Sequence, residues 1–143
     1  MTRTAEKTDI LKIAAAEKEI FSQPLSEGDV AGFLCNPLFT VMIAENKHRF
    51  AGYAVFYTLC GQSELITFAV LPEFRRQKIG EELMAEIITR CKALSVKKIL
   101  LEVRESNLPA IRLYEKKGFA QIAIRQNFYE KPPENGLTMY KEL

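Results

Sequence analysis

The sequence of 143 residues contains no tryptophan, one histidine and only three cysteines. The cysteines are widely spaced without a Cys-x-x-Cys pair, so neither a zinc site nor a disulfide framework is predicted. No apolar run approaches the ~20 residues that a membrane span needs, and residues 1–7 lack the apolar segment of a signal peptide. We therefore expect a cytoplasmic protein with no metal and no membrane association.

Charge of one sign is not in excess either. The chain has 20 lysines and arginines against 18 acidic residues, a net charge of +2, which does not by itself favour nucleic acid as a partner. Hydrophobic residues make up 48% and charged residues 27%, as in folded proteins. A chain of this length buries about two thirds of its unfolded surface, so we expect one domain over residues 1–143.

Apolar residues at intervals of three and four predict helices along the chain. The predicted helices are a segment from Asp9 to near Phe21, a short segment after Ser26, residues 79–94 and residues 110–117. Ser26 and Asp29 have the spacing of a capping box. Cys91 lies on the apolar stripe of the third helix, so we interpret it as a core residue rather than a nucleophile.

Runs rich in β-branched, aromatic and aliphatic residues predict the strands. The predicted strands are residues 39–44, 50–59, 64–71, 98–103, 119–128 and 137–142. The first two form a hairpin with His48 in its turn, so we expect a solvated histidine rather than a catalytic one. The order α, α, β, β, β, α, β, α, β, β predicts an α+β fold, with a mixed, mostly antiparallel sheet flanked by helices and a central β-α-β unit.

The strand at residues 64–71 runs through a basic turn directly into the third helix. A helix N-terminus leaves about four N–H groups without partners and carries about half a positive charge, so it can bind an anion. Arg75, Arg76 and Lys78 add mobile positive charge around these N–H groups. The turn therefore predicts an anion site, the alternative being a solvated basic turn.

Residues 75–80, Arg-Arg-Gln-Lys-Ile-Gly, resemble the coenzyme A pyrophosphate loop of the GNAT N-acetyltransferases, Gln/Arg-x-x-Gly-x-Gly/Ala. Lys78 stands where the family usually has its first glycine, and a side chain there could crowd the close backbone approach that glycine permits. The resemblance implies acetyl-CoA as co-substrate, with the pantetheine arm on the strand and the pyrophosphate on the turn. The implied coenzyme-binding residues are Phe68, Ala69, Val70, Arg75, Arg76, Gln77, Lys78, Ile79 and Gly80.

Transfer of an acetyl group to an amine needs a base for the amine and an acid for the departing thiolate. Glu102 lies inside an apolar strand, where an acid is costly unless it is paired or used; the alternative is an ion pair with Arg104 or a lysine. Tyr114 lies on the apolar side of the next helix, and its alternative is a packed core tyrosine. Asn107 can cap that helix as readily as it can bind a ligand amide.

The segment from Leu101 to Phe119 is similar to the RimI branch of the GNAT family, whose members acetylate the N-terminal alanine of a small-subunit ribosomal protein. That branch carries Leu-Glu-Val-Arg-x-Ser-Asn, then Ala-x-x-Leu-Tyr and Gly-Phe. The resemblance implies Glu102 as general base, Tyr114 as general acid and Asn107 as a coenzyme contact. It also implies direct transfer without an acyl-enzyme.

Residues 125–129, Arg-Gln-Asn-Phe-Tyr, resemble the branch's Arg-x-Asn-Tyr-Tyr, whose aromatic residues line the peptide groove. Leu25 stands where the branch tends to have the tryptophan of Phe-x-x-Pro-Trp-Ser. The implied substrate-binding residues are Leu25, Arg125, Phe128 and Tyr129. The implied acceptor is the N-terminus of a protein, most simply a ribosomal one; the alternatives are a small amine such as a polyamine or antibiotic, or a coenzyme-binding regulatory module without turnover.

Overall fold

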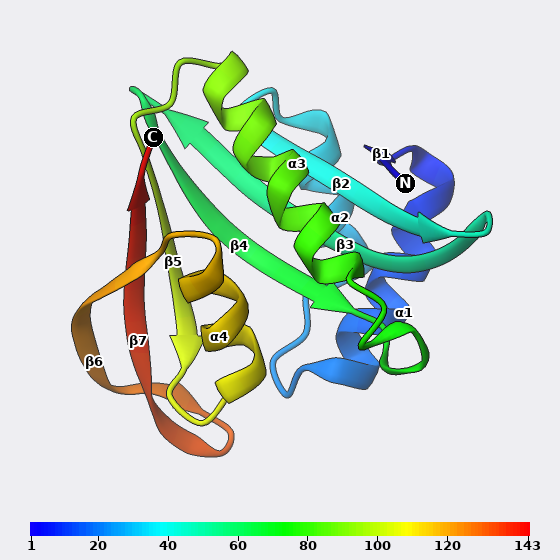
Figure 1. Ribbon diagram of the computed structural model, residues 1–143. Helices are drawn as coiled ribbons and strands as arrows, with labels where there is room; N and C mark the ends of the chain where they lie inside the picture. The colour runs from blue at the N-terminus through cyan, green and yellow to red at the C-terminus, as the bar shows by residue number, and fades with distance from the viewer.

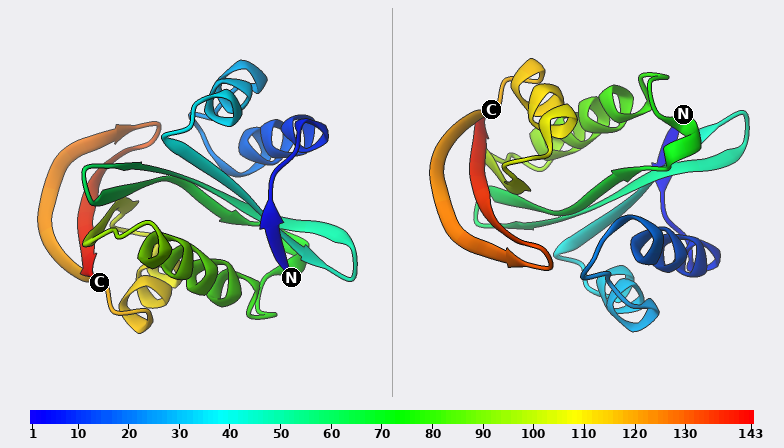
Figure 2. Two further views of the ribbon diagram at one scale, coloured as in Figure 1. Left: turned by 90° about the horizontal axis from the view of Figure 1, so that it is seen from above. Right: turned by 90° about the horizontal axis from the view of Figure 1, so that it is seen from below.

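A computed structural model describes residues 1–143 as a seven-stranded sheet with helices on both faces (Figures 1 and 2). The strands are β1 (Thr2–Thr4), β2 (Phe39–Asn46), β3 (Arg49–Leu59), β4 (Gln62–Val70), β5 (Lys98–Arg104), β6 (Ala120–Glu130) and β7 (Pro133–Glu142). The helices are α1 (Ile10–Ile20), α2 (Glu27–Cys35), α3 (Ile79–Ala93) and α4 (Leu108–Lys116), with 3₁₀ turns η1 (Lys7–Asp9) and η2 (Pro72–Phe74). The strand order is β1-β2-β3-β4-β5-β7-β6, and all neighbouring strands are antiparallel except β4 and β5.

Two hydrophobic cores lie on opposite faces of this sheet. Helices α3 and α4 cover a core of 19 buried residues, which includes Leu83 and Ile87 of α3. Helices α1 and α2 cover a core of 9 buried residues, which includes Ile13 and Val30. Figure 2 shows the two helix pairs on either side of the sheet. Each apolar stripe therefore faces its own side of the sheet, and a buried leucine or isoleucine there contributes about 1.5–3 kcal/mol.

The parallel strands β4 and β5 pair only at their first residues, where Gln62–Glu64 lie opposite Lys98–Leu100. Beyond that point the two strands part, as Figure 1 shows. The later half of β4 is paired with β3 alone, because no other strand lies against its second edge. The centre of the sheet therefore exposes unpaired main-chain groups of β4 on the side that faces β5.

The register identifies which groups these are. Leu71 N donates to Ala51 O at 2.8 Å just beyond the end of β4. Bonded and non-bonded pairs alternate along an antiparallel ladder, so the main chain of Ala69 faces β3, whereas that of Phe68 and Val70 faces the divergence. Phe68 thus has a free N–H and a free C=O group beside β5, and Val70 has a free N–H there, while its C=O accepts a hydrogen bond from the Arg75 side chain.

The predicted order of elements is confirmed, and several boundaries agree in detail. In the capping box, Asp29 N donates to Ser26 Oγ at 3.1 Å, and Ser26 N donates to the Asp29 carboxylate at 2.8 Å. Gly118 ends α4 with φ +96°, a conformation that favours glycine. Cys91 is fully buried, and His48 is exposed in the β2–β3 turn, as expected.

Other expectations were wrong. Strand β1 was not predicted, because the polar residues Thr2–Thr4 become a strand only through pairing with β2. The last two predicted strands, 119–128 and 137–142, extend further towards each other than expected, since β6 ends at Glu130 and β7 begins at Pro133. Leu94, the last residue of the third predicted helix, lies just past the end of α3 and is 55% exposed. None of the four helices has the length and apolar character needed to cross a membrane.

Candidate active site

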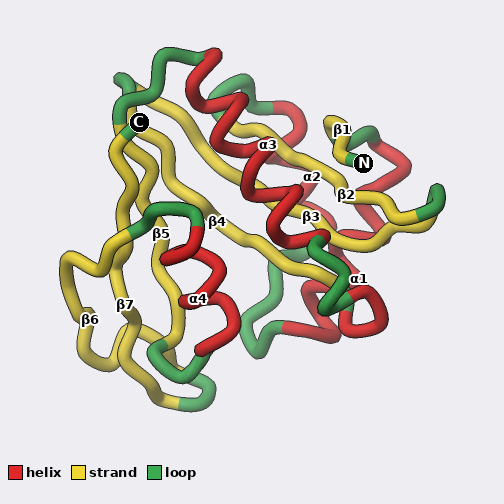
Figure 3. Tube along the Cα trace, in the orientation of Figure 1, coloured by secondary structure: helices red, strands yellow, loops and turns green.

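The turn between β4 and α3 (Figure 3) presents a row of free main-chain donors. Helix α3 begins at Ile79, and its first internal bond runs from Glu82 N to Lys78 O at 3.1 Å. The six N–H groups of residues 76–81 have no acceptor within the protein. Arg76 and Lys78 both have left-handed backbone, with φ values of 64° and 63°. Such alternation directs successive N–H groups into an anion-binding concavity, so the structure supports the predicted anion site.

Lys78 is the N-cap residue of α3, and its left-handed conformation explains the glycine that the coenzyme A loop usually has there. The lysine adopts this conformation with its side chain exposed. Arg75 Nε donates to Val70 O at 3.1 Å, which places this guanidinium across the end of β4. The carboxamide of Gln77 is engaged by Asn46 Nδ2 at 2.6 Å, so Gln77 offers a ligand mainly its main-chain N–H.

Gly80 allows the first turn of α3 to approach β4 and α4 closely. A Cβ atom at this position would lie 3.3 Å from Leu113 Cδ2 and 3.5 Å from Val70 Cγ2. The free N–H groups of the turn therefore lie directly beside the open edge of β4. One extended ligand can contact both, with its anionic part on the turn and its neutral arm along the strand.

The acidic side chain of Glu81, next to the turn, is neutralised by an ion pair. Glu81, in the first turn of α3, forms an ion pair with Lys116 of α4. The hydrogen bond from Lys116 holds the pKa of Glu81 below its usual range. Glu81 therefore remains ionised and paired with a cation from α4, while the basic side chains of the turn itself stay exposed.

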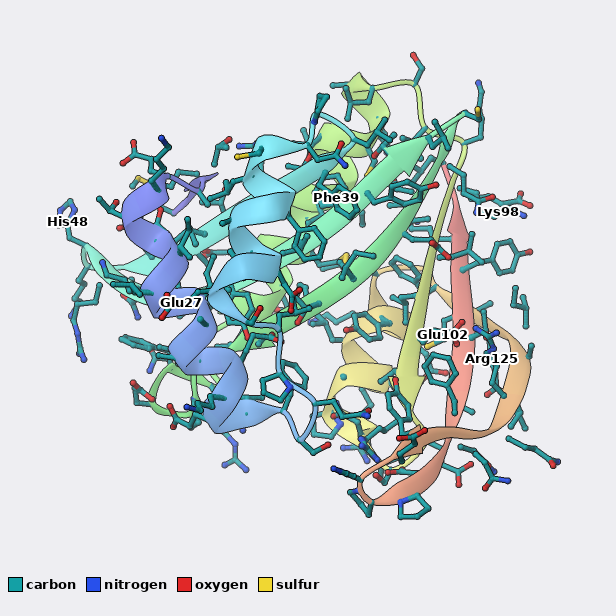
Figure 4. All side chains as sticks on the ribbon, turned by 180° about the vertical axis from the view of Figure 1, so that it is seen from behind. Glu27, Phe39, His48, Lys98, Glu102 and Arg125 are labelled. Atoms are coloured by element: carbon teal, nitrogen blue, oxygen red, sulfur yellow. The ribbon has the colours of Figure 1, made fainter.

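Glu102 lies on β5 with its side chain 27% exposed, on the face opposite α3 and α4. Its carboxylate accepts a hydrogen bond from Thr138 Oγ1 at 2.7 Å and from Arg125 Nη1 at 3.2 Å. Figure 4 shows Glu102 and Arg125 close together. The alternative ion pair of Glu102 with Arg104 is not formed, because Arg104 pairs with Glu134 at 3.1 Å, and Glu102 pairs with Arg125. Two donors orient Glu102, but the arginine is 56% exposed, so the carboxylate is accessible to an arriving amine once Arg125 moves.

Tyr114 is 5% exposed and packs between Phe68 of β4 and Phe119, with ring centroids 6.0 and 5.9 Å away. Its hydroxyl makes no hydrogen bond within the protein, yet no fully buried side-chain oxygen lacks a partner, so the hydroxyl reaches the solvent. Burial, followed by the charge of Tyr129, raises the pKa of Tyr114. The phenol is therefore protonated at neutral pH, and no acceptor within the protein holds its proton.

The two candidate catalytic groups lie on opposite faces of the sheet. Leu101 and Val103 belong to the core that contains Tyr114, and Glu102 alternates with them. Burial and then the charge of Glu102 raise the pKa of Tyr129, and the charge of Tyr129 in turn acts on Tyr114. The three groups are thus within electrostatic range of one another at the point where β4 and β5 diverge.

The aromatic pair of β6 is positioned by an irregularity in the strand. The register shifts between Arg125 and Tyr129, and Asn127 has φ 54°. The Phe128 ring lies over Gly136 of β7, where a Cβ would approach it to 3.0 Å. Phe128 and Tyr129 meet edge to face with ring centroids 5.0 Å apart, and Phe128 is 41% exposed. Beside Glu102, β6 therefore carries an exposed aromatic surface.

The remaining predicted residues have mixed environments. Leu25, in the α1–α2 connection, is half-buried, and its N–H donates to Glu17 Oε1 at 3.0 Å. Asn107 caps α4, with Oδ1 accepting from Ala110 N at 3.3 Å, so the capping role is confirmed and the coenzyme contact stays a prediction. Ile79 is 6% exposed, so it can serve a ligand only through its main chain.

Sequence reasoning missed three residues around the site. Thr138 of β7 lies directly opposite Glu102 of β5, a neighbour that only the register of the two strands reveals. Arg104 contacts the Lys131 and Pro132 carbonyls and lies over the Tyr129 ring at 4.3 Å. Glu17 is buried on α1, and its position four residues after the core residue Ile13 was an available signal.

Comparison with known proteins agrees with this geometry. The family model described as the acetyltransferase (GNAT) family matches residues 8–119. The chain belongs to the GNAT acetyltransferase family. It is accordingly an acyltransferase that uses acetyl-CoA, and its mixed sheet with flanking helices is the GNAT fold.

Curated relatives cover nearly the whole chain. A putative ribosomal protein bS18-alanine N-acetyltransferase of Bacillus subtilis is 30% identical over 139 residues, 96% of this chain and 92% of the relative. The ribosomal protein bS18-alanine N-acetyltransferase of Haemophilus influenzae is 31% identical over 137 residues, 94% of this chain and 92% of its own. The expected resemblance to the RimI branch is confirmed.

Solved structures have the same fold. The ribosomal-protein alanine N-acetyltransferase of Escherichia coli superposes with a TM-score of 0.91 at 27% identity, covering 99% of this chain and 92% of that one. Arabidopsis thaliana NAA60 in complex with acetyl-CoA superposes with a TM-score of 0.89 at 14% identity, covering 100% and 98%. The second likeness is one of fold alone.

Proposed function

We propose that this GNAT enzyme transfers the acetyl group of acetyl-CoA to the N-terminal α-amine of a protein that begins with alanine, the ribosomal protein bS18. The similarity to enzymes named for this acceptor extends over at least 92% of two relatives and supports the substrate class. The reaction would take place in the cytoplasm, because the acceptor is a ribosomal component. We propose that all residues from 1 to 143 form one catalytic domain.

The observation that carries the proposal is the environment of Glu102. Its carboxylate lies on an open face of the sheet, next to the exposed aromatic surface of β6, rather than inside an enclosed pocket. An exposed strand with aromatic side chains suits an extended peptide, whose first residue can reach the carboxylate while later residues lie along the surface. A small polyamine would gain little from such an open site.

The coenzyme would be held chiefly by main-chain groups. The N–H groups of residues 76–81 would bind the pyrophosphate, and the free N–H and C=O of Phe68 together with the N–H of Val70 would bind the pantetheine arm. The side chains of Arg75 and Arg76 would add charge at the rim. This arrangement directs the thioester towards the point where β4 and β5 part.

The chemistry is a direct transfer. Glu102, acting through a water molecule, accepts a proton from the α-ammonium group, and the neutral amine attacks the thioester carbonyl. The carbon–sulfur bond breaks as the amide forms, and the departing thiolate takes the proton of the Tyr114 hydroxyl. The second proton that the nitrogen loses on amide formation returns through solvent to the Tyr114 phenolate and restores the phenol. Tyr114 suits this role because its hydroxyl is protonated and has no competing partner in the free protein.

A panel of acceptors tests the proposal. Purified protein is incubated with acetyl-CoA and a peptide with the N-terminal sequence of bS18, the same peptide with a blocked N-terminus, or spermidine, and free thiol is measured. We expect thiol release only with the free N-terminus. Release with spermidine and not with the peptide would favour a small-amine acetyltransferase, and no release with any acceptor would favour a coenzyme-binding module.

A further inference from the structure

The buried carboxylate of Glu17 is not used in the chemistry described above, yet it is one of the most enclosed charged groups in the protein. Its residue is 2% exposed on α1, and it forms no ion pair with any lysine, arginine or histidine. Burying a carboxylate is costly unless hydrogen bonds replace the lost water. The three donors that surround Glu17 come from three different parts of the fold.

The two carboxylate oxygens of Glu17 face different elements. Oε1 accepts the main-chain N–H of Leu25, in the α1–α2 connection, at 3.0 Å. Oε2 accepts a hydrogen bond from Thr67 Oγ1 of β4 at 2.8 Å and another from the Tyr53 hydroxyl of β3 at 2.6 Å. Burial and then the adjacent Glu17 raise the pKa of Tyr53, so this phenol keeps its proton and donates it. A single rigid group therefore joins the α1–α2 connection to the central strands.

The strand that Glu17 holds is the one with the open edge. Thr67 directly precedes Phe68 and lies three residues before Val70, and the main-chain groups of Phe68 and Val70 face the β4–β5 divergence. The connection that Glu17 holds, residues 21–26, carries Leu25 and contacts the rim of the site, where Arg104 Nη2 lies 3.4 Å from Ser22 Oγ. Hydrogen bonds to a charged acceptor are stronger than those between neutral groups, so the carboxylate fixes the distance between these two segments.

We propose that Glu17 is a positioning residue, which sets the α1–α2 connection, one wall of the acceptor site, against the coenzyme strand β4. It touches neither substrate. This inference rests on the proposed function, because it takes residues 21–26 to contact the acceptor peptide. Loss of Glu17 should loosen the connection and weaken acceptor binding. It should leave the coenzyme site intact, because the ladder with β3 still holds β4 and the main-chain groups of residues 76–81 lie elsewhere.

Glu17→Gln is the first test variant. Glutamine keeps the length of the side chain and one acceptor oxygen, but it has no charge, and its amide group faces two hydroxyl donors. We expect the peptide KM to rise about tenfold, equivalent to 1.4 kcal/mol, with kcat little changed and the calorimetric Kd for acetyl-CoA unchanged. Glu17→Met, which keeps no acceptor, should raise the peptide KM further, and glutamine should rank between methionine and the wild type.

Asp9→Asn is the matched control. Asp9 is 1% exposed, accepts the main-chain N–H of Glu6 at 2.8 Å and is bound by Arg3 at 2.7 Å, so it is also a buried carboxylate that ties down main chain. It lies at the other end of α1, away from residues 21–26. We expect Asp9→Asn to lower the thermal midpoint without raising the peptide KM.

Hydrogen–deuterium exchange gives a readout that needs no acceptor. The peptide amides of residues 21–28 should exchange faster in Glu17→Gln than in the wild type or Asp9→Asn. If Glu17→Gln folds with wild-type exchange in this segment and an unchanged peptide KM, or if Asp9→Asn raises the KM equally, the inference is overturned. Wild-type protein that acetylates no peptide contradicts the proposed function alone, and the exchange result then still decides whether Glu17 holds the connection.

Discussion

Replacement of Tyr114 by phenylalanine separates catalysis from packing, because it removes one oxygen atom and leaves the ring. The ring contacts with Phe68 and Phe119, at centroid distances of 6.0 and 5.9 Å, persist in the variant. The hydroxyl has no hydrogen-bond partner within the protein. The free energy of unfolding should therefore fall by less than about 1 kcal/mol, the usual net contribution of one hydrogen bond.

The effect on turnover should be much larger. A positioned general acid contributes typically about 10²–10⁴-fold, so kcat should fall by at least about 10²-fold, equivalent to ~2.7 kcal/mol in activation free energy. The assay follows free thiol at saturating acetyl-CoA and peptide, and chemical denaturation of the same samples gives the free energy of unfolding. The pair of measurements distinguishes an acid from a core tyrosine.

The pH dependence adds a second check. Burial raises the pKa of Tyr114 above the ordinary value of about 10. The hydroxyl thus stays protonated between about pH 7 and pH 9, and the ratio of wild-type to variant kcat should be constant over that interval. Full turnover of the variant would show that Tyr114 is not the general acid. A fall of the wild-type kcat within that interval, absent in the variant, would show that the pKa of Tyr114 is not raised.

Three further predictions concern other parts of the site and its support. Glu102→Gln should keep the Thr138 hydrogen bond and the affinity for acetyl-CoA but lower kcat at least ~10²-fold, with partial recovery at high pH; wild-type turnover would make this carboxylate structural. Lys78→Gly should retain coenzyme binding in calorimetry, because glycine favours φ 63°, and a loss above tenfold, roughly 1.4 kcal/mol, would make the lysine a required ligand. Because Arg3 holds the pKa of Asp9 below its usual range, the free energy of unfolding should fall as the pH drops below about 4, and Asp9→Asn should flatten this dependence in denaturation curves; equal acid sensitivity would contradict it.

The parts of the fold set by local chemistry could be predicted from the sequence. The spacing of Ser26 and Asp29 predicts the start of α2, and the observed pair of main-chain hydrogen bonds confirms it. The basic turn predicts an anion site because free N–H groups are a general property of helix N-termini; the N–H groups of residues 76–81 are free as expected, and the bound anion stays a prediction. The resemblance to the coenzyme A loop even identified Lys78 as the unusual residue.

Long-range relations could not be predicted in the same way. Arg125, rather than Arg104, pairs with Glu102, because that pairing depends on the order β5-β7-β6 and on a register shift within β6. The parting of β4 and β5 leaves no mark in the local pattern of either strand. Glu17 sits at a core position of α1, but the donors that stabilise it come from residues up to 50 positions away.

The position of the transferred acetyl group tests the central claim most directly. A peptide with the N-terminal sequence of bS18 and an internal lysine is incubated with the protein and acetyl-CoA, and the product is sequenced by tandem mass spectrometry. The account predicts one acetyl group, on the α-amine of the first alanine, and none in the presence of Glu102→Gln at equal concentration and time. Acetylation of the lysine side chain, or an unmodified α-amine despite thiol release, would contradict it.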